Sequence, residues 1–204
     1  MKLNVPFFKQ TTPLNCGPTT LKMVLAYLDR DYNIKVLEEK TGINEGKGIS
    51  TIQIAIAAAS LNYKTEFYSK HILLNEKNLE LDFYKNYSDV DLERSKKLVE
   101  KAKSGGVKIQ EKELSLKEIL SFIKKDSIPI ILVDWNIIKN KKEKGYHGHF
   151  VPIVGYDNDS IYVHNSGLNE GEAFVKIPKV IFDEARKAQG TDEDIAVISL
   201  TIKI

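Results

Sequence analysis

The spacing of apolar residues predicts that the first third of the chain is helical. After residue 16 they recur at intervals of three and four, as on one face of an amphipathic helix. Further along, Ser50 and Gln53 form a capping box. The alanine- and isoleucine-rich segment after it is apolar nearly all round, so we expect it to be buried. The helices expected here cover residues 16–29, 36–41 and 50–59.

The second half of the chain has the alternating or continuously apolar runs that are typical of strands. A second capping box, Ser115 with Glu118, and a proline at position 178 predict two more helices among these strands. The expected strands cover residues 63–68, 107–114, 130–135, 149–156, 160–164, 173–177 and 195–202, after a short strand or extended arm at 3–8. We expect the last strand to close the sheet. Helices followed by mostly antiparallel strands indicate a single α+β domain over residues 1–204.

Residues 73–106 interrupt this order, because they are highly charged and end in two glycines. Within them, residues 89–103 predict an amphipathic helix, and we expect its inward-facing residues to be Leu92, Leu98, Val99 and Ala102. We therefore expect a helical insertion that lies over the domain. It is either a peripheral helix that only packs or a lid.

The composition narrows the classes of function. There are 30 basic and 28 acidic side chains, interspersed, so nothing predicts the clustered positive charge of a nucleic-acid-binding surface. The basic run at residues 139–144 is expected to be a solvated loop. Cys16 is the single cysteine, which excludes an internal disulfide and a cysteine-based zinc site, and no cofactor is expected. Because no segment is predicted to be a signal peptide or a membrane span, we expect a cytoplasmic protein.

The cysteine occupies a position that suits a nucleophile. Cys16 lies where a turn-rich segment passes into the first helix, with Asn15 as the expected N-cap and Pro18 in the first turn. The free N–H groups of a helix N-terminus stabilise a thiolate, so we expect the pKa of this thiol to be lowered. Upstream, Gln10 carries an amide that can donate to an oxyanion together with the Cys16 N–H. The alternative is that Cys16 is a small buried apolar residue.

A histidine and an asparagine downstream complete a candidate triad. His149 opens an apolar strand, and Asn165 ends the strand that follows it after the turn at residues 157–159. Two antiparallel strands joined by that turn bring the start of the first beside the end of the second. His149 can then act as the base and Asn165 as the group that orients it, in a Cys-His-Asn arrangement.

Simpler interpretations of these polar residues stay open. His149 can be a core histidine bonded to the backbone, and Asn165 can belong to a plain turn. A zinc site formed by His147, His149 and Asp157 is conceivable, but a His-x-His pattern alone is weak evidence for one. We expect His147 to lie in a loop and His164 to face away from the site, whereas His71 has no recognisable context. Trp135 is expected in the core or in the wall of the cleft.

Two motifs in these regions resemble those of the bacteriocin-processing, double-glycine leader peptidases, a papain-like family. The motifs are Q-x5-C-G-P-T-T from Gln10 and H-F-V-P-I-V-G-Y-D-N-D-x-I-Y-V-x-N from His149. The resemblance covers residues 2–61 and 128–204, whereas the middle insertion matches poorly. It implies a papain-like fold with Cys16 as nucleophile, His149 as base, Asn165 as third member and Gln10 as oxyanion donor. The family usually has Asp-Pro where this chain has Asn165-Ser166.

The residues and the resemblance together predict a cysteine peptidase that cleaves a peptide or isopeptide amide through an acyl-enzyme. A peptide or protein is therefore the expected partner. Two alternatives stay open. The same triad serves an acyl transferase or deamidase, and a catalytically degenerate domain of this kind binds a peptide without cutting it.

Overall fold

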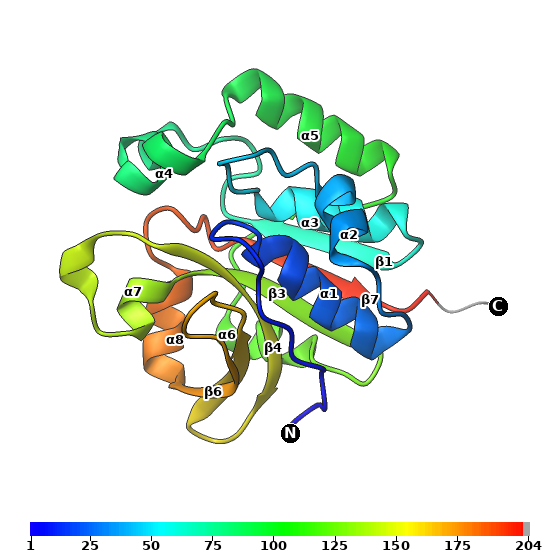
Figure 1. Cartoon of the computed structure of the whole chain (residues 1–204), viewed down its shortest axis with the longest axis vertical. Helices are drawn as coiled ribbons and strands as arrows, with labels where there is room; N and C mark the ends of the chain where they lie inside the picture. Colours follow the sequence, from blue (N-terminus) through cyan, green and yellow to red (C-terminus); the bar gives the residue numbers. More distant parts are fainter. Residues whose placement is uncertain (202–204) are drawn as a thin grey trace.

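A seven-stranded sheet organises the molecule, which we describe from a computed structural model over residues 1–201 (Figure 1). The strand order is β2-β1-β7-β3-β4-β5-β6. The β1–β2 pair is parallel, and the other neighbouring pairs are antiparallel. The strands are β1 (Lys64–Ser69), β2 (Lys108–Glu111), β3 (Ser127–Asp134), β4 (Gly148–Tyr156), β5 (Ser160–Asn165), β6 (Glu172–Pro178) and β7 (Ile195–Ser199).

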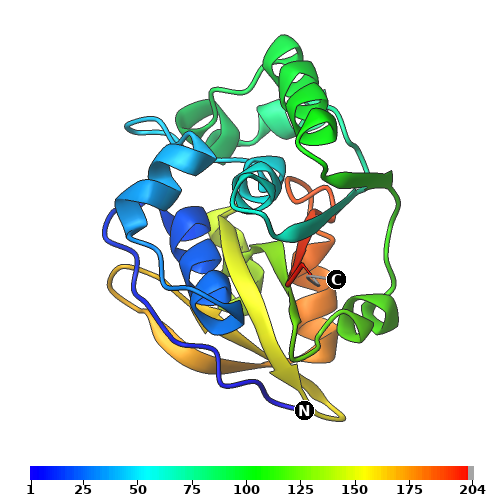
Figure 2. The same cartoon turned by 90° about the vertical axis from the view of Figure 1, so that its right-hand side faces the viewer.

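Helices cover both faces of this sheet, as the side view in Figure 2 shows. On one face α1 packs on β3 and β4, and α3 packs on β1 and β7, whereas α8 packs on β3 from the other face. The α-helices are α1 (Cys16–Leu28), α2 (Ile34–Thr41), α3 (Thr51–Ser60), α4 (Asp82–Tyr87), α5 (Leu92–Ser104), α6 (Leu116–Ser121), α7 (Trp135–Ile138) and α8 (Lys179–Arg186). Two 3-10 turns are η1 (Glu76–Glu80) and η2 (Lys142–Lys144). No helix in residues 1–201 is both long enough and apolar enough to cross a membrane.

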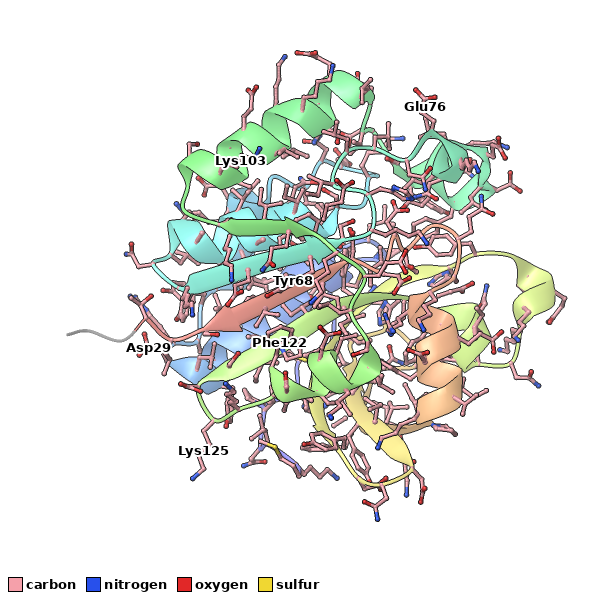
Figure 3. All side chains as sticks on the ribbon, turned by 180° about the vertical axis from the view of Figure 1, so that it is seen from behind. Asp29, Tyr68, Glu76, Lys103, Phe122 and Lys125 are labelled. Carbon is pink, nitrogen blue, oxygen red and sulfur yellow. The ribbon has the colours of Figure 1, made fainter. Side chains whose placement is uncertain are left out.

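The predicted α+β class with a mostly antiparallel sheet is confirmed, and local signals account for much of it. Both capping boxes form, at Ser50–Gln53 and at Ser115–Glu118. The third helix is buried over most of its length, as its nearly continuous apolar composition predicts. Behind the sheet, Phe122 at the end of α6 contacts Tyr68 of β1, with ring centroids 5.4 Å apart (Figure 3).

Two expectations about the strands are wrong, and of the two forms expected for residues 3–8 the arm is the one that forms. The last strand does not close the sheet, because β7 lies at its centre between β1 and β3. That expectation extended to residue 202, which lies outside the described residues. Residues 3–8 form an arm rather than a strand, anchored where the Leu3 N–H donates to the Val154 carbonyl at 2.7 Å. Trp135 starts α7 instead of ending β3, because the Asp134 side chain caps that turn at the Asn136 N–H.

The segment at residues 73–106 contains η1, α4 and α5, and α5 packs on α3 (Figure 1). Asp91 caps α5 by accepting from the Arg94 N–H, so the helix begins at Leu92. Leu92 was expected to face inward, yet it is 40% exposed, since it is the first helical residue and precedes the buried stripe at Val99 and Ala102. Glu76 and Lys103 lie on the outer surface of the segment (Figure 3).

Candidate active site

A cleft of about 1070 Å³ contains the four residues singled out from the sequence. Cys16, Gln10, His149 and Asn165 all line it. Its walls come from the start of α1, the segment before α3, the 73–106 insertion, the start of β4 and the loops after β5 and before β7. Residues that are distant in the sequence therefore meet in one concave site, as binding and catalytic groups commonly do.

The first turn of α1 fits tightly against β4. A Cβ atom added to Gly17 would come within 2.6 Å of Ile49 Cδ1 and 3.3 Å of Phe150 Cδ2. One turn on, the Thr20 hydroxyl donates to the Phe150 carbonyl at 3.0 Å. Phe150 directly follows His149, so this contact joins the first turns of α1, which Cys16 begins, to the residue next to the histidine.

Asn15 does not cap the helix with its side chain, contrary to expectation. Its Oδ1 accepts from the N–H groups of Thr11 and Thr12 at 3.2 and 3.1 Å, and its Nδ2 donates to the Glu38 carboxylate at 2.7 Å. The side chain instead folds back over the preceding turn and ties it to α2. Asn15 therefore fixes the approach to Cys16.

Burial raises the pKa of the Cys16 thiol, although the backbone amide groups of Phe150, Gly17 and Cys16 act in the opposite direction. The lowered pKa expected from the helix terminus is wrong for this state of the chain. A thiolate at this partly buried position loses more solvation than the first turn of a helix returns. The resting sulfur is thus a neutral thiol.

His149 is a buried, neutral base. Burial lowers its pKa to about 3, His147 adds to that effect, and a hydrogen bond with the Asn165 side chain opposes it. The Trp135 ring lies over the imidazole, with centroids 5.1 Å apart. Its Nε2 atom is buried and has no hydrogen-bond partner in the described part of the chain, so this nitrogen is able to accept a proton.

Asn165 is held by its own loop while it contacts His149. Its Nδ2 donates to the Glu170 carbonyl at 2.7 Å, and its Oδ1 accepts from the Gly167 N–H at 2.9 Å. These bonds fix the position of the amide, and both of its ends keep capacity for a further hydrogen bond. The antiparallel β4–β5 pair brings the two residues together.

Gln10 lies in the site, but its amide already has partners. Nε2 donates to the carbonyls of Thr12 and Pro13 at 2.9 and 3.1 Å, and Oε1 accepts from the Ser166 hydroxyl at 3.1 Å. Both amide hydrogens are therefore bonded within the loop that leads to Cys16. Gln10 can donate to an oxyanion only if one of these two hydrogen bonds breaks first.

The other histidines take different places. His164 is in the core, with Nε2 2.9 Å from the Val5 carbonyl and Nδ1 accepting from the Phe174 N–H at 3.0 Å. His147 and His71 are exposed residues at the cleft. Asp157 follows the far end of β4 from His149 and binds Tyr162, which separates the three ligands of the conceivable zinc site. Over residues 1–201, no three His, Cys, Asp or Glu side chains gather where they could hold a metal.

Sequence reasoning missed two acids in the same cleft. Asp192 and Asp194 lie in the loop before β7 and line the cleft wall. Burial raises the pKa of both, and that of Asp194 rises to about 7. The available signal was the acidic run T-D-E-D directly before a buried apolar strand, an unusual place for adjacent charges.

Solved structures with this fold are peptidase domains. The peptidase domain of Streptococcus ComA, a bifunctional ABC transporter of the quorum-sensing pathway, has a TM-score of 0.52 at 16% identity, covering 97% of this chain and 100% of that one. A C39-like peptidase from Bacillus anthracis has 0.61 at 17%, covering 100% of both chains. A double-glycine-motif protease from an AMS/PCAT transporter, solved with its leader peptide, has 0.54 at 18%, covering 98% and 94%. The predicted papain-like leader-peptidase fold is confirmed.

The sequence itself places the chain in a family with a different name. The chain belongs to the family described as guanylylate cyclase, whose model matches residues 5–198. Guanylyl cyclase 1 of Arabidopsis thaliana is 27% identical over 215 aligned positions, which cover 97% of this chain and 76% of the relative. The chain therefore has a fold similar to that of peptidase domains and belongs to a family that is named for a cyclase.

Proposed function

We propose that this chain is a cysteine hydrolase that cleaves a peptide or isopeptide amide. One observation carries the proposal: Cys16 opens a helix that is bonded to β4 at Phe150, beside a buried imidazole with a free Nε2 and an asparagine partner. A nucleophile, a base and a group that orients the base are the minimum set for acyl transfer from an amide.

The protonation states indicate how the reaction starts. Thiol and imidazole are both neutral at rest, so the Cys16 proton passes to His149 Nε2 as sulfur attacks the substrate carbonyl. The tetrahedral oxyanion accepts hydrogen bonds from the Cys16 N–H and from one Gln10 N–H. That Gln10 N–H must first break its hydrogen bond with a carbonyl of its own loop. The imidazolium then protonates the leaving amine, the C–N bond breaks, and water attacks the thioester with His149 again as base.

The charge of the cleft favours a peptide over a nucleoside triphosphate. Two lysines and five carboxylates line it, and a polyphosphate is repelled by such an excess of negative charge. The lysines are Lys47 and Lys139, and the acids are Glu38, Glu45, Glu170, Asp192 and Asp194. The cyclase activity in the name of the plant relative is therefore the less favoured candidate here.

A specific observation supports a second candidate, a domain that binds a peptide without cutting it. The Gln10 amide is fully bonded within its loop, and the Cys16 pKa is raised. Both features suit an inactive site as well as a resting one. Acyl transfer to an amine by the same three residues is the remaining alternative, and competition between an added amine and water separates it from hydrolysis.

The deciding experiment is a peptide-library digest of the wild type and of Cys16→Ala, with products read by mass spectrometry. We expect cleavage by the wild type alone, and His149→Ala should behave like Cys16→Ala. Thr19→Val, which alters a buried α1 hydroxyl without a partner, serves as the control that keeps activity. Cleavage by Cys16→Ala at the wild-type rate would refute the mechanism. Formation of cyclic GMP from GTP without peptide cleavage would replace the proposal with the cyclase.

A further inference from the structure

We infer that Asp192 and Asp194 form a subsite for a cationic side chain, arginine or lysine, of the peptide that the cleft binds. The inference rests on the proposed function, because it names a feature of that site's ligand. The two carboxylates lie in the same cleft as Cys16, and neither forms an ion pair with a lysine, arginine or histidine of the described residues.

The sheet sets the distance between this subsite and the sulfur. The Leu132 N–H donates to the Asp194 carbonyl at 3.2 Å, and Leu132 pairs with Phe150 in the β3–β4 ladder. Asp194 and Phe150 are thus separated by two strand spacings, about 10 Å. Because the first turn of α1 packs on Phe150, an extended arginine or lysine close to the scissile amide can reach the carboxylate.

A buried amide from the insertion provides independent support. Asn78 is 1% exposed and lines the cleft, and its Nδ2 donates to Asp192 at 2.7 Å. Its Oδ1 has no hydrogen-bond partner in the described part of the chain, so one buried acceptor beside the acids lacks a donor. Asn75 holds the other Asp192 oxygen at 3.0 Å. The pair of amides fixes the carboxylate and leaves an acceptor for an N–H-rich ligand.

The surroundings favour a long cation over a small one. Leu74, Tyr84 and Tyr146 line the same cleft and offer apolar and aromatic surface. An arginine or lysine packs its aliphatic stem on such a surface and delivers its charged end to a carboxylate. The two partly buried carboxylates repel each other, and the charges of Lys70 and His71 act only on Asp192. A bound guanidinium or ammonium offsets the remaining cost.

The test uses benzamidine, a planar cation, and benzamide, its neutral isostere, as probes. Isothermal titration into the full chain carrying Cys16→Ala should show benzamidine binding at least about tenfold tighter than benzamide, and Asp194→Asn should weaken it about 30-fold. Glu100→Gln removes an exposed charge of α5 that does not line the cleft and should leave binding unchanged. If Asp194→Asn fails to fold, the benzamidine–benzamide ratio of the parent chain still decides.

The outcomes separate this inference from the proposed function. Equal binding of the two probes, or benzamidine binding unaffected by Asp194→Asn, would overturn the subsite. Peptide cleavage without preference for arginine or lysine would also overturn it and leave the hydrolase standing. Benzamidine binding as expected, with no peptide cleaved, would support the subsite and overturn the hydrolase. Displacement of benzamidine by GTP at lower concentration than by an arginine peptide would assign the acids to a nucleotide and overturn the inference.

Discussion

Burial sets the chemistry of the individual residues in this site. Cys16 and His149 are shifted in opposite directions, and both shifts favour the uncharged form. An activated thiolate would need its charge to be solvated by the site. With both groups uncharged at rest, the proton stays on the sulfur, and under the proposed mechanism it moves only when a substrate carbonyl arrives. Reactivity toward a small reagent and toward a substrate should therefore differ.

Alkylation of Cys16 tests this protonation state. Because the pKa is raised, we expect iodoacetamide to label the unliganded chain slowly at about pH 6, with a rate that climbs through pH 9 and shows no acidic plateau. Cys16 is the single cysteine, so intact mass reports the site directly, and Cys16→Ala supplies the blank. Rapid labelling that does not change between about pH 5 and pH 7 would mean that a thiolate–imidazolium pair exists at rest.

Asp194 gives a stability prediction of known sign. Its folded pKa of about 7 lies above the ordinary aspartate value of 3.8, so its contribution to stability is present at low pH and is lost as pH rises toward 7. The Asp194→Asn variant has no carboxyl group at this position, so its stability does not fall in this way as pH rises. The free energy of unfolding should exceed that of the wild type by about 2 kcal/mol at pH 8 and match it near pH 4.

Urea unfolding of the two proteins across this range measures the difference. The His149 pKa, lowered to about 3, acts in the opposite sense, because its stabilisation is lost as pH falls below the unfolded value near 6.5. That effect is common to both proteins and cancels in the comparison. A variant that is less stable at high pH would show that Asp194 is needed structurally rather than for a ligand.

Among the elements, α1 carries the sulfur and must keep a fixed position on β4. Adjacent threonines allow a matched test, because the Thr20 hydroxyl donates to Phe150 whereas the buried Thr19 hydroxyl has no partner. Thr20→Val should lower the free energy of unfolding by about 1–2 kcal/mol, as it leaves a buried carbonyl unpaired. Thr19→Val should be neutral or stabilising.

The same two threonine variants separate an effect on the position of the sulfur from an effect on stability. Thr20→Val should reduce kcat on any peptide substrate more than it changes KM, because the sulfur shifts relative to His149. Thr19→Val should leave both constants unchanged. Equal loss of stability in the two variants would argue that the Thr20–Phe150 bond contributes nothing to holding the helix.

Elements with local signals could be predicted from the sequence, and their arrangement could not. The apolar spacing after Cys16 and the Ser50–Gln53 capping box both fix helices through contacts a few residues apart. The central place of β7 depends on pairing with β1 and β3, which are distant in the sequence and leave no pattern in residues 195–199 themselves. The prediction that Asn15 caps α1 was wrong for a related reason, because its side chain donates to Glu38 of another helix.

At the scale of the whole molecule, the sequence predicted residues that meet in one cleft, but not their protonation and bonding states. Turn and strand patterns placed His149 beside Asn165, because a hairpin joins them locally. The raised pKa of Cys16, the bonded amide of Gln10 and the acids before β7 all arise from burial by distant segments. Burial of that kind depends on the complete fold, so no short window of sequence contains it.

One carbonyl accepts two of the hydrogen bonds that join the insertion and the loop before β4 to the cleft wall. The Tyr84 hydroxyl of α4 and the Tyr146 hydroxyl of the loop before β4 both donate to the Gly190 carbonyl, at 2.5 and 2.9 Å. A side chain at Gly190 would meet both Leu81 and Tyr146, so this close approach needs glycine. None of the residues in α4 is buried, and the helix therefore depends on a few such bonds to stay over the cleft.

We expect the two tyrosines to be redundant. Tyr84→Phe or Tyr146→Phe alone leaves the Gly190 carbonyl with one donor, so hydrogen exchange in residues 76–91 should change little. The double variant leaves that carbonyl unpaired, and the same amides should exchange about tenfold faster while those of α1 and β4 keep the wild-type rate. An unchanged double variant would show that other contacts hold α4 in place, such as the packing of Phe83 on Tyr146, with centroids 5.3 Å apart, and the hydrogen bond from the Gly48 N–H to the Tyr87 carbonyl. Peptide binding should slow exchange of these amides in the wild type, because Phe83, Tyr84 and Tyr87 of α4 line the cleft that the ligand would occupy.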